Sequence, residues 1–236
     1  MIHLPQLHPQ RPGLFPDPET ALTEPNGLLA WGGDLSAERL LAAYAQGVFP
    51  WYNEEEPILW WSPDPRCVFH TDAIHISRSL RKQLDKSHWR LTADTSFSRV
   101  MRACAAPRNG QPGTWIGPEM IAAYEELHRR GHAHSVEVWD RGSLVGGIYG
   151  VAVGRLFCGE SMFSARSGGS KVALAGLCRL LHGWGFPFLD AQVTNDHLLS
   201  MGAVEIARRP FVAQARKLAA MPGMVGSWVS HPVALP

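Results

Sequence analysis

The sequence predicts a mixed α/β (α+β) fold, in which helices pack on a sheet of mixed strand direction. Two segments of alternating polarity flank Asp140-Arg141-Gly142, a pattern that predicts a β-hairpin. A third strand is predicted at 157–163, and a strongly apolar helix at 170–184 separates it from another strand at 188–193. Strands in succession, followed by helix and strand in turn, are typical of a sheet covered by helices.

The N-terminal quarter differs in composition from the rest of the chain. Residues 1–64 hold much of the proline and two tryptophan-bearing turns around one helix, which Ser36 can cap and Gly47 can end. A Pro-Asp-Pro turn at 63–65 is stiff and is a natural boundary. We therefore expect a small N-terminal α+β domain over 1–64 and a larger domain over 65–236.

The remaining elements of the larger domain follow from their periodicity. Apolar residues recur every three to four positions in four segments, and each segment is bounded by a residue that starts or ends helices. The expected helices are 77–85, 97–105, 118–130 and 210–219, and the expected hairpin strands are 133–139 and 144–153.

Composition narrows the possible functions. Hydrophobic residues make up 45% of the 236 residues and charged residues 18%, which predicts a packed core and little disorder. The net charge is +1, so any contact with nucleic acid must come from a local basic patch. The sequence has no apolar run of membrane-spanning length, and its first residues lack a basic segment followed by an apolar one, so we expect neither a membrane span nor a secretion signal. The four cysteines lack C-x-x-C spacing, so we expect reduced core thiols, no metal site and a cytoplasmic protein.

Polar side chains interrupt two apolar strands of the larger domain. Glu160 stands among Phe and Met in one strand, and the two-residue period of the other strand places Asp190 and Gln192 on one face. A single buried acid is often only structural, and Asn195 could simply cap the next turn. Several polar groups at neighbouring strand ends instead indicate a substrate cleft.

A basic helix and several tryptophans form a second pattern. Arg78, Arg81 and Lys82 recur along one side of the helix at 77–85, and such a stripe is often just a solvated face. Trp51 and Trp115 lie in loop-like segments with Pro or Gly nearby. Together these residues could hold an unpaired nucleotide end by stacking and phosphate attraction, or the tryptophans could simply join the two domains.

The loop at 166–171 precedes the apolar helix. It resembles the acetyl-CoA-binding loop of the common N-acetyltransferases, with Arg166 and Gly169 in place and Lys171 where that loop has a small residue. The alternative is an ordinary loop in which Ser170 caps the helix.

The motifs taken together resemble those of the bacterial leucyl/phenylalanyl-tRNA protein transferases over nearly the whole chain. They include Gly47-Val48-Phe49-Pro50-Trp51, Cys158-Gly159-Glu160-Ser161-Met162-Phe163, and the segments 24–30, 32–35, 59–66, 113–116, 131–137 and 190–197. The resemblance implies an acetyltransferase-like domain in which aminoacyl-tRNA takes the place of acetyl-CoA, with no cofactor. It implies transfer of Leu, Phe or Met from tRNA to the N-terminal Arg or Lys of a protein, which marks that protein for degradation.

The same resemblance assigns the candidate residues. Trp51 and Trp115 would border the site of the tRNA 3′ adenosine, and Glu160 would lie in the acceptor site. Asp190 and Gln192 would sit at the reaction centre, and Arg78, Arg81 and Lys82 would track the acceptor stem.

Aminolysis of an ester needs no enzyme nucleophile, because the α-amine of the peptide attacks. The protein must align amine and ester, accept a proton and stabilise the oxyanion. The donor side chain needs an apolar pocket, and Asn195 is a further candidate for substrate binding. Candidates for the pocket are Ile148, Phe157, Met162 and Phe188. Two alternatives remain open, namely a CoA-dependent N-acyltransferase and a noncatalytic RNA-binding module.

Overall fold

The computed structural model describes residues 4–107 and 114–236, so Gly113 of the motif at 113–116 and the first three residues lie outside the described part. A seven-stranded sheet with the order β11-β5-β10-β9-β8-β7-β6 forms the centre, and a four-stranded sheet with the order β1-β2-β4-β3 belongs to the N-terminal segment. The large sheet is mixed, since β10 runs parallel to β9 and antiparallel to β5. The predicted α+β class is therefore confirmed.

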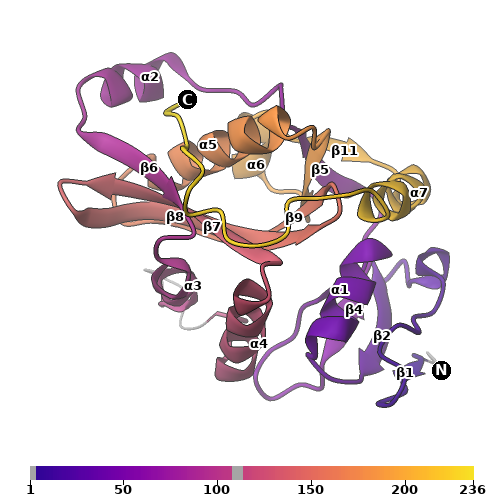
Figure 1. The fold of residues 1–236 in the computed structure, drawn as a ribbon. Helices are drawn as coiled ribbons and strands as arrows, with labels where there is room; N and C mark the ends of the chain where they lie inside the picture. Colours follow the sequence, from indigo (N-terminus) through magenta and orange to yellow (C-terminus); the bar gives the residue numbers. More distant parts are fainter. Residues whose placement is uncertain (1–3, 108–113) are drawn as a thin grey trace.

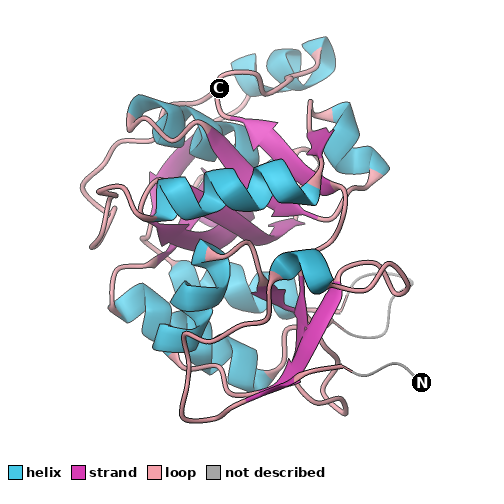
Figure 2. Ribbon diagram, turned by 90° about the vertical axis from the view of Figure 1, so that its right-hand side faces the viewer, coloured by secondary structure: helices cyan, strands magenta, loops and turns pink. Residues whose placement is uncertain are grey.

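The strands of the small sheet are β1 (Gln6–Leu7), β2 (Leu28–Gly32), β3 (Phe49–Pro50) and β4 (Leu59–Trp61). The strands of the large sheet are β5 (Arg66–His70), β6 (Trp89–Ala93), β7 (Ala133–Asp140), β8 (Ser143–Val153), β9 (Leu156–Ser164), β10 (Phe188–Gln192) and β11 (Val204–Ile206). The small sheet stands apart from the large one, below it in Figure 2.

The helices are α1 (Ala37–Ala45), α2 (Arg78–Asp85), α3 (Phe97–Ala105), α4 (Pro118–Arg129), α5 (Gly169–Gly183), α6 (Asp196–Ser200) and α7 (Arg208–Ala219), with a short 3-10 turn at Pro18–Thr20. Helices α5 and α6 lie on one side of the large sheet, and α3 and α4 lie on the other (Figure 1). None of the described helices combines the length and the apolar character needed to cross a bilayer.

The β7–β8 hairpin and the expected helices confirm the periodicity argument. The hairpin turn places Arg141 at φ 49° and Gly142 at φ 85°, as a two-residue turn between twisted antiparallel strands requires. The predicted helix and strand limits agree with the structure within about two residues, the usual uncertainty of such boundaries. The strands β1 to β6 and β11 and the short helix α6 were not identified from the sequence.

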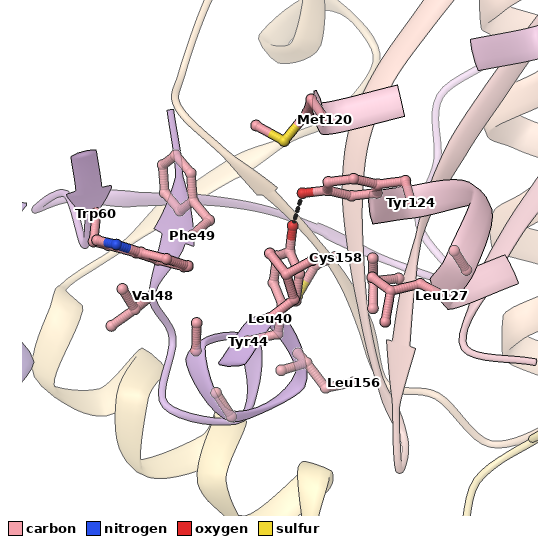
Figure 3. Packing of buried hydrophobic residues seen from close by; sticks show 14 of the residues in the cluster. Leu40, Tyr44, Val48, Phe49, Trp60, Met120, Tyr124, Leu127, Leu156 and Cys158 are labelled. Carbon is pink, nitrogen blue, oxygen red and sulfur yellow. Dashed lines mark hydrogen bonds between the residues drawn. The ribbon is translucent and has the colours of Figure 1, made fainter. Parts of the chain in front are cut away.

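The N-terminal elements and the large sheet share one hydrophobic cluster. Tyr44 on α1 and Trp60 on β4 are fully buried in it together with Tyr124 on α4. The hydroxyl groups of Tyr44 and Tyr124 are hydrogen-bonded across the junction (Figure 3). The expected domain boundary at residue 64 falls between β4 and β5. One hydrophobic cluster extends across this point, so the division into two domains stays a prediction.

Candidate active site

Two β-bulges lie close together in the large sheet. In β9, Ser161 pairs with Tyr149 and Gly159 with Gly150, which leaves Glu160 as the extra residue. In β10, a second irregularity against β5 falls between Asp190 and Gln192. A bulge redirects a side chain and ends the regular alternation of the strand. Both polar positions singled out in the sequence therefore lie at bulges of strands that pair with each other.

The second bulge separates Asp190 from Gln192. Gln192 has a φ of 63°, a left-handed conformation that is uncommon for a residue with a side chain. Its backbone N–H donates to Oδ1 of Asp190 at 2.9 Å, and its side-chain Nε2 donates to Oε1 of Glu160 at 2.8 Å. The expectation that Asp190 and Gln192 line one face of a regular strand is therefore wrong, because the strand is not regular at this point.

Asp190 is fully buried and paired with Arg66. The Nε and Nη2 atoms of Arg66 donate to the two carboxylate oxygens at 2.8 and 2.7 Å. Because both oxygens accept from the guanidinium and one also accepts from Gln192, Asp190 holds other groups in place. It does not face the cleft.

Glu160 has the most perturbed environment of the cleft. The hydroxyl of Tyr124 donates to its Oε2 at 2.8 Å, and Tyr44 contacts Tyr124 behind it. Burial raises the pKa of the Glu160 carboxyl from 4.5 to about 7, and its hydrogen bonds to Tyr44, Tyr124 and Gln192 act against that rise. A carboxyl with a pKa near neutrality in a cleft indicates a functional site.

These polar groups open into a cleft with a volume of about 390 Å³. Trp51 and Trp115 line it, and Trp51 keeps 43% of its surface exposed. Among the described lining residues, Glu160 alone carries a group that titrates near neutral pH. The rest of the lining includes Phe69, Ile148, Met162, Leu174, Leu189, Gln192, Asn195 and Leu198.

The apolar part of this lining differs in part from the expected set. Ile148 and Met162 line the cleft as expected, but Phe157 and Phe188 lie outside it. Phe157 is fully buried with its ring centre 5.9 Å from that of Trp228, and Phe188 packs 6.0 Å from Phe211. The two rings lie in different hydrophobic clusters: Phe188 points to the face opposite that of the cleft-lining Leu189, and Phe157 is packed into the core on the Leu189 side.

The residues that complete the apolar lining were not identified from the sequence. Leu174 comes from α5, Leu189 from β10, Leu198 from α6 and Phe69 from β5. Their helices and strands read as ordinary core segments, so no local pattern separates them from other buried residues. Asn195 lines the cleft and also caps α6, since its Oδ1 accepts the N–H of Leu198 at 3.0 Å.

The basic residues of the predicted helix lie on α2, which does not line the cleft. Arg78, Arg81 and Lys82 are exposed on α2, whereas Leu80 and Leu84 are buried. Gln83 on the same helix donates to the carbonyl of Ser167 at 2.9 Å. That loop continues β9, the strand that carries Glu160, so α2 is joined to the site strand although its basic residues do not line the cleft.

Comparisons of the sequence with known proteins point to one family. The family model described as leucyl/phenylalanyl-tRNA protein transferase matches residues 68–216, and the model of its N-terminal domain matches residues 33–64. A relative named leucyl/phenylalanyl-tRNA--protein transferase from Xanthomonas euvesicatoria pv. vesicatoria is 60% identical over 91% of this chain and 86% of its own. One with the same name from Xylella fastidiosa is 57% identical over 91% of this chain and 88% of its own.

Similarity to solved structures is much weaker. The structure of L-PGS from Bacillus licheniformis aligns with a TM-score of 0.38 at 11% identity, over 71% of this chain and 54% of that one. A match of this kind is too weak to support an argument, whereas the sequence matches extend over most of the chain. On the sequence matches, this chain belongs to the leucyl/phenylalanyl-tRNA protein transferase family.

Proposed function

We propose that this chain transfers Leu, Phe or Met from aminoacyl-tRNA to the N-terminal Arg or Lys of an acceptor protein, which marks that protein for degradation. The observation that carries the proposal is a cleft lined by Trp51 and Trp115 together with the hydrogen-bonded pair of Glu160 and Gln192. Family membership supports the same reaction. We place the reaction in the cytoplasm, where the buried thiols of the four cysteines would stay reduced.

Each lining group has a task in this reaction. Trp51 and Trp115 bracket the terminal adenosine, and Ile148, Met162 and Leu174 surround the apolar side chain of the donor. Glu160 attracts the cationic acceptor and its amine. An α-amine has a pKa of about 8, so a carboxyl with a pKa of about 7 is a matched proton acceptor.

Gln192 completes the reaction centre. Its carboxamide is held toward Glu160 and can orient the attacking amine or the tetrahedral centre. Asp190 accepts the backbone N–H of Gln192 and so holds this residue in place. Because both of its carboxylate oxygens are paired with Arg66, we assign it no direct role in taking the proton. Asn195 also lines the cleft, where it can contact the peptide or the ribose.

The direct test is transfer of radiolabelled Leu from Leu-tRNA to a peptide that begins with Arg. Label should appear on that peptide and remain absent from a peptide identical except for an N-terminal acetyl group, which blocks the amine. Tight binding of the tRNA with no labelled peptide would replace the proposal with the noncatalytic RNA-binding alternative.

Several backbone donors of the loop expected for the CoA-dependent alternative are already used by internal hydrogen bonds. The N–H groups of Ala165 and Arg166 donate to the carbonyl of Val145, and that of Gly169 donates to the carbonyl of Arg166. The N–H of Ser170 donates to Oγ of Ser164 at 2.8 Å. A pyrophosphate would compete with these internal bonds, so the loop favours a structural role, and acyl transfer from acyl-CoA is not expected.

Loss of either cleft tryptophan should weaken donor binding. Trp51→Ala and Trp115→Ala are each expected to reduce affinity for aminoacyl-adenosine by about 1 to 3 kcal/mol, since a stacked base contributes that much. The measurement is equilibrium binding of a nonhydrolysable aminoacyl-adenosine. Trp184→Ala is the control, because this ring packs on Trp228 outside the cleft. Unchanged affinity in a folded Trp51 or Trp115 variant would make that residue merely structural.

Neutralising Arg78, Arg81 and Lys82 should weaken the binding of aminoacyl-tRNA and leave the use of aminoacyl-adenosine almost unchanged. Changing Arg78, Arg81 and Lys82 to Gln is expected to weaken tRNA binding and to lower the slope of its salt dependence by about one unit per lost phosphate contact. Aminoacyl-adenosine lacks those phosphates, so its use should hardly change.

A matched control removes the same charge from another helix. Arg209, Arg216 and Lys217 are exposed on α7, and their replacement by Gln should leave the salt slope near the wild-type value. Equal effects of the two triple variants would mean that the protein responds to its overall charge, which would contradict a specific role for α2.

A further inference from the structure

Arg66 is a buried cation at the junction of the two sheets. It is the first residue of β5, and only 1% of its surface is exposed. An isolated charge in such a place would be strongly destabilising, so its partners define its role. Two of its nitrogens hold Asp190 in a two-bond, side-by-side arrangement, and Nη1 donates to the carbonyl of Gly47 at 3.0 Å.

Through Asp190, Arg66 reaches the reaction centre. The same Oδ1 that accepts from Arg66 also accepts the backbone N–H of Gln192. That hydrogen bond spans the bulge and holds Gln192 in its left-handed conformation. The carboxamide of Gln192 in turn donates to Glu160. Arg66, Asp190, Gln192 and Glu160 therefore form one continuous chain of charge-assisted hydrogen bonds, of which only the last two line the cleft.

Through Gly47, Arg66 also contacts the segment that carries Trp51. The Gly47 carbonyl immediately precedes the segment that leads to Phe49, Pro50 and Trp51, all of which line the cleft. The guanidinium lies 4.8 Å from the centre of the Phe49 ring and 4.5 Å from that of Phe211. One side chain thus contacts both the segment that presents Trp51 and the segment that presents Gln192.

We infer that Arg66 is a positioning residue for the transfer reaction. By binding Asp190 it sets the orientation of the Gln192 carboxamide. By binding the Gly47 carbonyl it fixes the position of the segment that carries Trp51 relative to Gln192. The inference rests on the transfer reaction proposed above. Arg66 touches no substrate and moves no proton. Its planar fork is essential, because a lysine keeps the charge but cannot make two parallel bonds to Asp190 and a third to Gly47.

The test compares Arg66→Lys with Arg208→Lys. Arg208 is also buried, with 7% of its surface exposed, and its Nη1 donates to the carbonyl of Ser62 at 2.8 Å. Both arginines bind the N-terminal segment, but only Arg66 contacts Asp190. Arg66→Lys is expected to lower kcat by about 10- to 100-fold, as small displacements of a reacting group do, with KM for peptide and tRNA within about threefold. Arg208→Lys is expected to keep the wild-type kcat.

Two further measurements separate positioning from a loss of folding. Hydrogen exchange should accelerate at Gln192 in Arg66→Lys and stay unchanged in the hairpin β7–β8, and this readout does not depend on activity. In a double-mutant cycle with Asp190→Asn, the double variant should be no slower than Asp190→Asn alone, because both changes break one chain. If the Arg66→Lys variant does not fold, Arg66→Gln can replace it, because glutamine keeps a planar side chain with an N–H donor. The double-mutant cycle with Asp190→Asn is then done with Arg66→Gln.

The outcomes are distinct. Absence of transfer by the wild-type protein would overturn the proposed function, and the exchange of Gln192 would still test the clamp. The positioning role would be overturned if the double variant showed a fall in kcat equal to the product of the falls in the two single variants. Hydrogen exchange that rises equally throughout the molecule would also overturn it. A rise in KM alone, with kcat unchanged, would also overturn it.

Discussion

Gln192→Ala should lower the transfer rate by about 100- to 1000-fold, the usual effect of removing a group that is aligned with the reacting atoms. Binding of aminoacyl-tRNA should remain within about twofold of the wild type. The reason is geometric, since the carboxamide is held by Glu160 on one side and its backbone by Asp190 on the other. A group fixed this firmly acts on the transition state more than on the bound donor.

Asp190→Ala should show the same separation of rate from binding. This change removes the acceptor of the Gln192 N–H and leaves the Arg66 guanidinium buried without its carboxylate. We therefore expect a loss of stability in addition to the loss of rate, because an unpaired buried charge is strongly destabilising. Single-turnover kinetics on the folded fraction separates the two effects.

Gln46→Ala is the control for both variants. Gln46 follows α1, and its Nε2 donates to the carbonyl of Ala42 outside the cleft. It should transfer Leu at the wild-type rate. If Gln192→Ala instead weakened donor binding and left the maximal rate unchanged, Gln192 would be a binding residue, and the reaction centre would have to lie elsewhere in the cleft.

Glu160→Gln should stabilise the fold at high pH and remove the charge that selects the acceptor. Burial raises the folded-state pKa of this carboxyl from 4.5 to about 7. The folded protein therefore keeps a proton that the unfolded chain has already lost, and the free energy of unfolding falls as pH rises from about 4.5 through 7.

Glutamine has no proton to lose, so the variant should not show this decline. At pH 8 the variant should be more stable than the wild type by about 3 kcal/mol, and below about pH 4.5 the two should be equal. Urea unfolding at a series of pH values measures the difference. A difference that stays constant with pH would contradict a raised pKa at Glu160.

The same variant should lose acceptor discrimination. An acceptor that begins with Arg or Lys brings positive charge to the carboxylate, whereas Leu or Ala leaves the carboxylate unpaired. In the wild type, KM for an Arg peptide should fall as pH rises through about 7. In Glu160→Gln it should be insensitive to pH over that range, and most of the preference for Arg over Leu should disappear.

The decisive measurement is competition between two peptides that differ only in their first residue. Aminoacyl-tRNA binding serves as the internal control, because it should be retained in the variant. If the variant keeps the wild-type preference, recognition must come from another acidic group, and the exposed Asp196 or the loop 54–56 becomes the next residue set to test.

The apolar residues expected in the donor pocket show what could not be predicted from the sequence. Phe157, Phe188, Ile148 and Met162 all lie in apolar strands, and a strand pattern distinguishes two faces but not which face opens into a cleft. Packing of α5 and α6 over the sheet places Leu174 and Leu198 beside Ile148 and Met162. No window of sequence contains that information, because the residues come together only when the helices dock.

The chain by itself determined the local features of this protein. Periodicity predicted the α+β class, the hairpin, the main helices and the two strands that carry Glu160 and Gln192, since repeat length is a property of neighbouring residues. The motifs also pointed to the family. The tertiary structure alone decided how those groups interact.

The contact between Arg66 and Asp190 joins residues 124 positions apart, and the pKa of Glu160 is raised by burial that arises only when the chain has folded. The physical reason is that desolvation and hydrogen-bond geometry depend on long-range packing. The bulges that aim Glu160 and Gln192 likewise depend on the register of the neighbouring strands.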